Sequence, residues 1–480
     1  MRLKPRDIEI NPNLPKYPFD NDLLDRKEEI ENLTQIVCKV EDPFVLAIDA
    51  PWGTGKTTFV KLWHNYLENK SLKVIFFNAW ETDFAEDPLI ALISKLDKWV
   101  QSLDDVYLKH EVWRDFKQKI VPKLLKRSAI AGVKLATAGI LDIEKDCEKV
   151  LSDLFGEITG DLIDKFNEKS QAITQFKDVI KKVVDKLPEE QNNLIIFVDE
   201  LDRCRPTYAI ELLERIKHLF STERLIFILS TDMEQLAHSI CAVYGNNFNS
   251  KRYLNRFIDL DYSLKEPDYK KYIESQFTNL FIDDFYQKRR NGGNQKKDLI
   301  NFTLFMANTF DFKLRDINLL TTRVKLVLSS TPDSTFVLAP ILITLLTLRY
   351  YNERLYREYK HNPILLEQVI GFIFRELEKS RNKYIGFSVF ILIDIISYLI
   401  IFADDAEKEP KLITQYESSI TSHRKNNSSY PNYQQTADTQ ALSNRINEIR
   451  AELRWGNSSG RNFRKIVFEQ IELLHQFNIN

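Results

Sequence analysis

Residues 44–60 constrain this chain more than any other stretch, because an apolar, β-prone run leads into a glycine-containing turn and then into Lys-Thr-Thr. The order of strand, glycine turn, Lys-Thr and helix is the pattern of a phosphate-binding P-loop. Gly53 and Gly55 would let the backbone approach a phosphate closely. Lys56 would reach the β- and γ-phosphates, and the Thr57 hydroxyl would ligate Mg²⁺.

One position departs from the full G-x-x-x-x-G-K-[ST] pattern, because Ala50 stands where the first glycine is usual. A small residue still permits a close turn, so we interpret the stretch as a variant P-loop. The alternative is a chance Gly-Lys-Thr in a surface loop, which the preceding apolar strand argues against. The predicted nucleotide-binding residues are Ala50, Pro51, Trp52, Gly53, Thr54, Gly55, Lys56, Thr57 and Thr58.

A second anchor follows at residues 194–198, an apolar run that ends in Asp199 and Glu200. An acidic pair after one apolar run is weak evidence alone, but after a P-loop it indicates a Walker B strand. Asp199 would hold Mg²⁺, and Glu200 would orient or deprotonate an attacking water. With Lys56 these two form the predicted catalytic set. Asp202 and Arg203 either add charge at the same strand end or form a local ion pair.

Two further strands are predicted over 72–77 and 225–232, where polar residues follow the first strand and end the second. Functional groups of open α/β sheets lie at the carboxyl ends of the strands. Asn78, Thr231 and Asp232 are therefore candidate sensors of the γ-phosphate. A simple strand cap is the alternative at Asn78.

Three arginines are candidates for contacting phosphate from elsewhere in the chain. Arg252 and Arg256 lie four apart in a predicted helix and would share one face, as an arginine finger for a neighbouring subunit. Arg315, in a helix after the core, is a candidate second sensor. The alternative for all three is a charged, solvated helix face. A strand over 257–262 is expected to end the core.

Bulk composition excludes several classes of protein. A net charge of −2 gives no basic field, so the sequence offers no evidence for direct nucleic-acid binding. The four cysteines form no CxxC pair, which favours a reduced, cytoplasmic setting without structural zinc. The first residues lack the apolar segment of a secretory signal.

The fold class predicted from these patterns is α/β, with a mostly parallel sheet interrupted by a long helical segment. At 480 residues the chain can hold several domains. We predict a discontinuous nucleotide-binding core at 1–100 and 190–265, a helical insertion at 101–189, an all-α lid at 266–403, a polar, partly disordered linker at 404–440, and closing helices at 441–480.

Three apolar runs raise the question of a membrane span. Residues 128–141 would reach about 21 Å as a helix, short of the ~30 Å bilayer core, and 335–348 contains Pro340. Residues 385–403 could span about 28 Å, but Asp394 at the centre would cost about 2.5–3.5 kcal/mol. A buried helix is the favoured interpretation of each run, and membrane association through 385–403 is the alternative.

Together these features resemble the KAP family of P-loop NTPases. The resemblance rests on APWGTGKTT (50–58), FNAW (77–80), DELDRC (199–204), RYLNR (252–256) and LRDINL (314–319). It implies a sheet of the additional-strand type, a helical lid, and ATP rather than GTP as the nucleotide. Many members carry transmembrane helices between the two Walker motifs, a place taken here by 101–189. Bacterial members similar to this one are implicated in defence against phages and plasmids.

The resulting hypothesis is a Mg²⁺-dependent ATPase whose nucleotide state drives a conformational or assembly switch, in bacterial anti-phage or anti-plasmid defence. No nuclease, protease or deaminase constellation is visible, so the chain is expected to self-associate or to recruit an effector protein. One alternative is a nucleotide-gated scaffold with little turnover. Another is a membrane-tethered NTPase.

Overall fold

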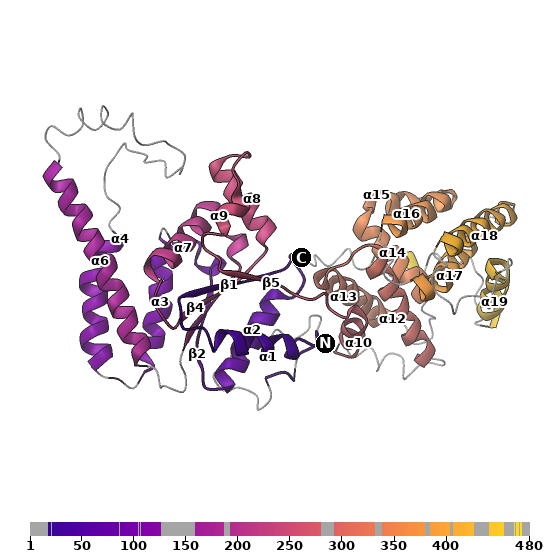
Figure 1. The fold of residues 1–480 in the computed structure, drawn as a ribbon. Coiled ribbons are helices and arrows are strands. Elements are labelled where there is room, and N and C mark those ends of the chain that lie inside the picture. Colours follow the sequence, from indigo (N-terminus) through magenta and orange to yellow (C-terminus); the bar gives the residue numbers. More distant parts are fainter. Residues whose placement is uncertain are drawn as a thin grey trace. The chain divides into compact units, whose positions relative to one another are not determined.

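The computed structural model divides into two compact units, Asp7–Glu266 and Pro267–Asn480, which we describe separately (Figure 1). The described residues are 18–125 except 21, 86, 104 and 106, then 159–186, 193–279, 292–331, 338–379, 385–403, 407–426, 441–455, 465, 467–469 and 471–472. The apolar run at 128–141 lies outside them.

The first unit is built on a five-stranded parallel sheet with the order β2-β3-β4-β1-β5. Its strands are β1 (Phe44–Asp49), β2 (Lys73–Asn78), β3 (Leu194–Asp199), β4 (Leu225–Thr231) and β5 (Leu260–Ser263). Strand β4 lies between the P-loop strand β1 and the acidic strand β3, which confirms the additional-strand topology. Strand β5 begins three residues later than expected, because the chain turns at 254–257 to bury Phe257.

Alternate residues of the sheet feed two separate apolar cores, as the period of two in a strand requires. Val45, Ile196 and Phe227 lie in one core, and Leu46 and Phe197 in the other. Strands β3 and β4 are buried along their whole length, which is typical of a parallel sheet covered by helices on both faces.

Helices cover both faces of this sheet. One core includes α1 (Lys27–Val37) and α2 (Lys56–Asn69), and the other includes α3 (Pro88–Gln101), α7 (Pro206–Leu219) and α8 (Met233–Tyr244). Helix α1 begins at Lys27. Asp22 lies before the helix, and its carboxylate accepts the backbone N–H groups of Arg26 and Lys27.

A helical segment separates β2 from β3 in sequence. It holds η2 (Leu108–Trp113), η3 (Phe116–Ile120), α4 (Val121–Leu125) and α6 (Thr159–Asp185). A chain of ring contacts runs from Trp113 through Phe116 and Phe176 to Phe220, at the end of α7. Aromatic packing therefore ties this segment to the face of the sheet that α7 covers.

The described elements of the second unit are all helices. The longer ones are α10 (Tyr269–Asn279), α12 (Gly292–Thr309), α13 (Leu314–Ser330), α14 (Ala339–Tyr351), α15 (Glu353–His361), α16 (Leu366–Lys379), α17 (Ile385–Ala403), α18 (Glu409–Asn426) and α19 (Ala441–Trp455). The helix expected from the run at 335–348 is α14, with Pro340 in its first turn and its residues 339–348 all buried.

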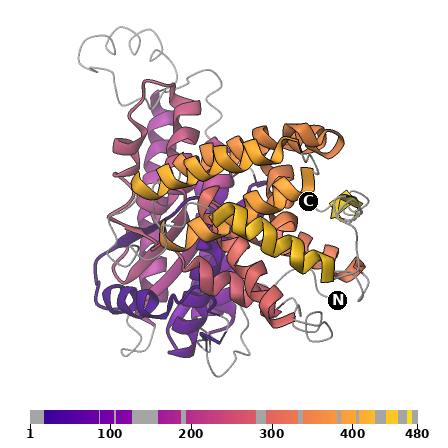
Figure 2. The same ribbon diagram turned by 90° about the vertical axis from the view of Figure 1, so that its right-hand side faces the viewer.

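The apolar run at 385–403 forms α17, which packs within this unit against α14, α18 and α19 (Figure 2). Asp394 forms an ion pair there with Arg445 of α19. Across the described residues, no helix combines the length and apolarity needed to cross a membrane.

The polar stretch at 404–440, where we expect a linker, contains helix α18 over Glu409–Asn426. Leu412, Tyr416 and Ile420 recur every four residues and are buried. This stripe is enough to hold the helix on its neighbours despite the polar composition around it.

Candidate functional site

The P-loop has the backbone that its glycines predict. Gly53 and Gly55 have φ angles of 79° and 95°, in the left-handed region that favours glycine. Helix α2 starts directly after Gly55, at Lys56. Ala50 is buried, and its N–H donates to the carbonyl of Thr231 at 3.4 Å. The alanine at the unusual position therefore fits a close approach of this turn to strand β4.

The Lys56 ammonium lies at the N-terminus of α2 and is largely buried. It donates a hydrogen bond to the carbonyl of Ala50 in the loop itself. Burial lowers the pKa of Lys56, and four carboxylates oppose this shift: Asp202, Asp232, Asp199 and Asp49. A cation beside helix N–H groups favours the binding of an anion such as phosphate.

Asp199 is buried at the end of β3, with 1% of its side chain exposed. Burial raises the pKa of its carboxyl group, and the hydroxyls of Ser230 and Thr57 act in the opposite direction. Asp199 Oδ2 and Thr231 Oγ1 are buried without a hydrogen-bond partner in the described part of the chain. Carboxylate and hydroxyl oxygens are ligands that Mg²⁺ prefers, so this donor set fits the ion.

Glu200 follows in the left-handed region, with φ 61° and ψ 30°. Its Oε2 accepts a hydrogen bond from Asn78 Nδ2 at 3.0 Å. Its Oε1 forms an ion pair with Arg203, whose guanidinium lies over the ring of Trp80 at 5.6 Å. The structure thus places Asn78, a candidate sensor, directly against the candidate base.

Asp232 is the N-cap of α8, where its Oδ1 accepts the N–H of Gln235 at 3.1 Å. This capping role accounts for its position as well as a sensor role would. Asp49, which we did not predict as part of the site, ends β1 and accepts the N–H of Met233 at 2.9 Å. An acidic residue at the end of the P-loop strand was the available signal.

A hydrogen bond between side chains, which sequence patterns do not predict, joins the P-loop to the acidic turn after β3. The indole N–H of Trp52 donates to the Asp202 carboxylate. Of the two charges whose pairing was left open, Asp202 therefore bonds to the P-loop and Arg203 bonds to Glu200. A link between residues 150 positions apart has no local signature.

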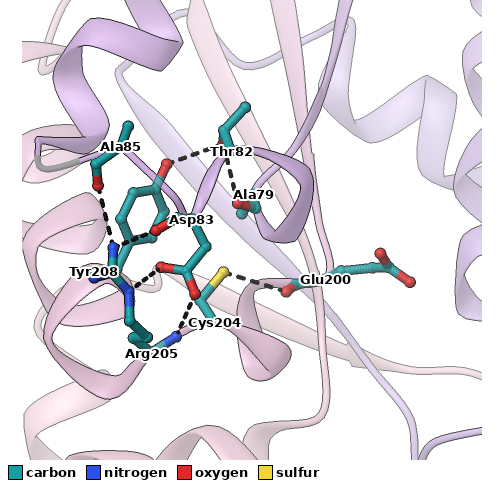
Figure 3. A network of polar contacts seen from close by, with 8 residues as sticks. All are labelled: Ala79, Thr82, Asp83, Ala85, Glu200, Cys204, Arg205 and Tyr208. Carbon is teal, nitrogen blue, oxygen red and sulfur yellow. Dashed lines mark hydrogen bonds and ion pairs between the residues drawn. The ribbon is translucent and has the colours of Figure 1, made fainter.

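A polar network fixes the loop after β2 to the start of α7 (Figure 3). The Arg205 guanidinium pairs with the Asp83 carboxylate at 2.9 Å and also reaches the carbonyl of Ala85 at 3.2 Å. The hydroxyls of Thr82 and Tyr208 lie 3.0 Å apart in a hydrogen bond. The loop that follows Asn78 is thereby held in one position beside the acidic turn.

Cys204 belongs to the same network, since its thiol donates to the carbonyl of Glu200 at 3.6 Å (Figure 3). Burial raises the pKa of this thiol. A thiol that stays protonated is a poor nucleophile, so the geometry agrees with a packing role.

The three arginine candidates lie on other elements than these groups. Helix α9 (Ser250–Leu254) contains Arg252 but ends before Arg256, so the expectation that both share a helix face is wrong. The cause is a turn at 254–257 that brings Phe257 into the core. Arg315 is exposed in the first turn of α13, in the second unit.

Comparisons with known proteins agree with this geometry. The model of the KAP family P-loop domain matches residues 26–330. The phage T7 exclusion protein of Escherichia coli (strain K12) is 22% identical over 249 residues, which are 50% of this chain and 32% of that protein. The chain therefore spans about a third of the length of this relative.

Two solved structures align at low scores. The ORC2 protein of Aeropyrum pernix in its ADP form has a TM-score of 0.30 at 10% identity, covering 97% of each chain. AMPPCP-bound DnaA from Aquifex aeolicus has a TM-score of 0.27 at 10% identity, covering 97% of this chain and 98% of that one. TM-scores this low do not establish a shared fold, whereas the family model matches well over half of the chain. The chain is a member of the KAP family of P-loop NTPases.

Proposed function

We propose that this protein binds ATP with Mg²⁺ and hydrolyses it. The observation that carries the proposal is the buried Asp199 carboxylate, which has an unpartnered oxygen and lies beside the Thr57 hydroxyl at the start of α2. A buried carboxylate without a full set of partners is costly. A divalent cation held by Thr57 and Asp199 would remove that cost.

The predicted catalytic and binding residues divide the proposed reaction between them. The P-loop N–H groups and Lys56 would bind the phosphates, and the metal would neutralise charge on the phosphate oxygens. Glu200 would accept the proton of the attacking water, and Asn78 would position Glu200. We further propose that Thr231 and Asp232 sense the terminal phosphate, and that Arg252 or Arg256 acts on a neighbouring subunit.

The test uses Glu200→Gln and Lys56→Ala. Glu200→Gln should lower steady-state phosphate release about a hundredfold or more and keep ATP binding, because the base acts after binding. Lys56→Ala should weaken binding as well. Glu234→Gln, an exposed glutamate on α8, is the matched control and should keep full activity. Full activity in both site variants would exclude this assignment.

A scaffold that binds ATP with little turnover is the second candidate. It is favoured by one observation, namely that both carboxylate oxygens of Glu200 are engaged, by Arg203 and Asn78. Comparing bound nucleotide per chain with the rate of phosphate release separates the two candidates. Competition between ATP and GTP in the same assay tests whether the site prefers adenine or guanine nucleotides.

We also propose a role in phage exclusion, through self-association or an effector protein. The support is the similarity to the phage T7 exclusion protein, which covers only part of that relative. Phage plating on cells with the wild-type chain or Lys56→Ala tests the role. Oligomer mass with and without ATP, on protein purified together with its partners, tests the assembly.

A further inference from the structure

The turn after β3 holds an ion pair that the proposed reaction does not use. Arg203 lies three residues after Glu200, at the end of the short helix η4 (Leu201–Arg203). Its backbone N–H donates to the Glu200 carbonyl at 3.2 Å, so the turn folds the guanidinium back onto the Glu200 carboxylate. The Arg203 side chain is 30% exposed and the Glu200 side chain 12%.

Both oxygens of Glu200 are therefore occupied by protein donors, the guanidinium at Oε1 and the Asn78 amide at Oε2. A general base must accept a hydrogen bond from the water that it activates. A water at Glu200 would have to compete with a charge-assisted bond, the stronger class of hydrogen bond.

The surroundings hold this arrangement in place. Trp80 lies two residues after Asn78, and its ring supports the Arg203 guanidinium from one side. The loop that carries Trp80 is tied to α7 by the bond of Arg205 to Asp83. The end of β2 and the turn after it thus contact both members of the ion pair. Asn78 bonds to Glu200, and Trp80 lies against Arg203.

The same turn also faces the phosphate-binding loop. Asp202, next to Arg203, accepts the indole N–H of Trp52 from the P-loop and lies close enough to Lys56 to affect its pKa. The turn that carries Arg203 therefore lies beside the loop that would hold the phosphates. Arginine binds phosphate oxygens well, often through two parallel bonds.

We propose that Arg203 is a positioning residue that restrains Glu200, and that the terminal phosphate of a bound nucleoside triphosphate draws Arg203 away and frees the base. The inference rests on the proposed ATPase function. It predicts that the triphosphate releases the restraint and that the diphosphate, which lacks the terminal phosphate, does not.

Steady-state turnover of Arg203→Gln tests the restraint. We expect kcat/KM to rise about tenfold, through a lower KM at similar kcat, because triphosphate binding no longer has to break the charge-assisted bond that holds Glu200 in the resting state. Arg203→Lys keeps the charge and should stay near the wild-type rate. The matched control is Arg215→Gln, whose 2.7 Å ion pair with Asp87 is similarly buried, at 26% and 13% exposure. A kcat/KM of Arg203→Gln that falls, or that equals the Arg215→Gln value, overturns the proposal.

Tryptophan emission gives a readout that does not depend on hydrolysis. A non-hydrolysable triphosphate analogue should change the emission of Trp80 as the guanidinium leaves its ring, and the diphosphate should not. The same titration on Trp80→Phe isolates this signal. Triphosphate binding without a change at Trp80 overturns the inference. A change at Trp80 without any phosphate release would instead count against the ATPase proposal alone.

Discussion

Two carboxylates in different units of the chain, Asp199 fully buried and Asp394 partly buried, have opposite surroundings. Asp199, at the sheet edge, is 1% exposed and has an oxygen without a partner. Asp394, in the apolar helix α17, is paired with Arg445 of α19. A buried charge costs free energy unless it is paired. We therefore interpret Asp394, which is paired, as a structural residue, and Asp199, which is incompletely paired, as part of a ligand-binding site.

The Asp199→Asn substitution is the strongest test of the difference between the two carboxylates. We expect phosphate release to fall about a hundredfold or more, because a metal ligand supplies several kcal/mol of transition-state stabilisation. The free protein should meanwhile become more stable at neutral pH. Burial raises the folded-state pKa of Asp199, so its favourable contribution to stability is lost as pH rises through that pKa.

Thermal unfolding with and without Mg²⁺ and ATP measures the second effect. The variant should unfold at a higher temperature than the wild type in the absence of ligands, and should lose the added stability that Mg²⁺-ATP gives the wild type. A ligand-free variant less stable than the wild type would show that Asp199 is a structural residue like Asp394.

A smaller effect is expected at His64, which is buried on the P-loop helix α2 against the rings of Phe76 and Phe197. Burial lowers the pKa of His64 from 6.5 to about 4. The unfolded chain then binds a proton that the folded chain excludes, so stability present above pH 6.5 is lost as pH falls towards 4. The loss from this group is about 3 kcal/mol.

Denaturant unfolding of the wild type and His64→Gln between pH 7 and pH 4 checks this value. The difference between the two proteins should shrink as pH falls, because the variant lacks the titrating group. Burial raises the pKa of Glu68, whose carboxylate lies 3.6 Å from His64 Nδ1, so the comparison is made with Glu68→Gln present in both proteins. A pH-independent difference would mean that His64 is not excluded from protonation.

The parts of the site that could be predicted are those in which neighbours in sequence act together. The P-loop backbone and the acidic end of β3 follow from local patterns, and the sheet order follows from the family resemblance. Bonds such as Asn78 to Glu200 and Trp52 to Asp202 join residues 122 and 150 positions apart. Their partners depend on which strands become neighbours, so single-sequence patterns cannot name them.

The smallest predicted effect on stability is at Asp394, the carboxylate that is paired. The Asp394→Asn substitution leaves the Arg445 guanidinium, 28% exposed, without this carboxylate and should lower the free energy of unfolding by about 1–2 kcal/mol. A second substitution, Arg445→Met, should recover part of the loss, since it removes a guanidinium that has kept only its exposed partner Glu448 and adds apolar surface between α17 and α19. A double-mutant cycle from denaturant unfolding gives the coupling between the two residues. We expect Asp199→Asn to stabilise the ligand-free protein, and the same result for Asp394→Asn would contradict this prediction. It would mean that the ion pair with Arg445 does not offset the cost of partly burying the Asp394 charge. Pairing alone would then not distinguish a structural carboxylate from a ligand-binding one.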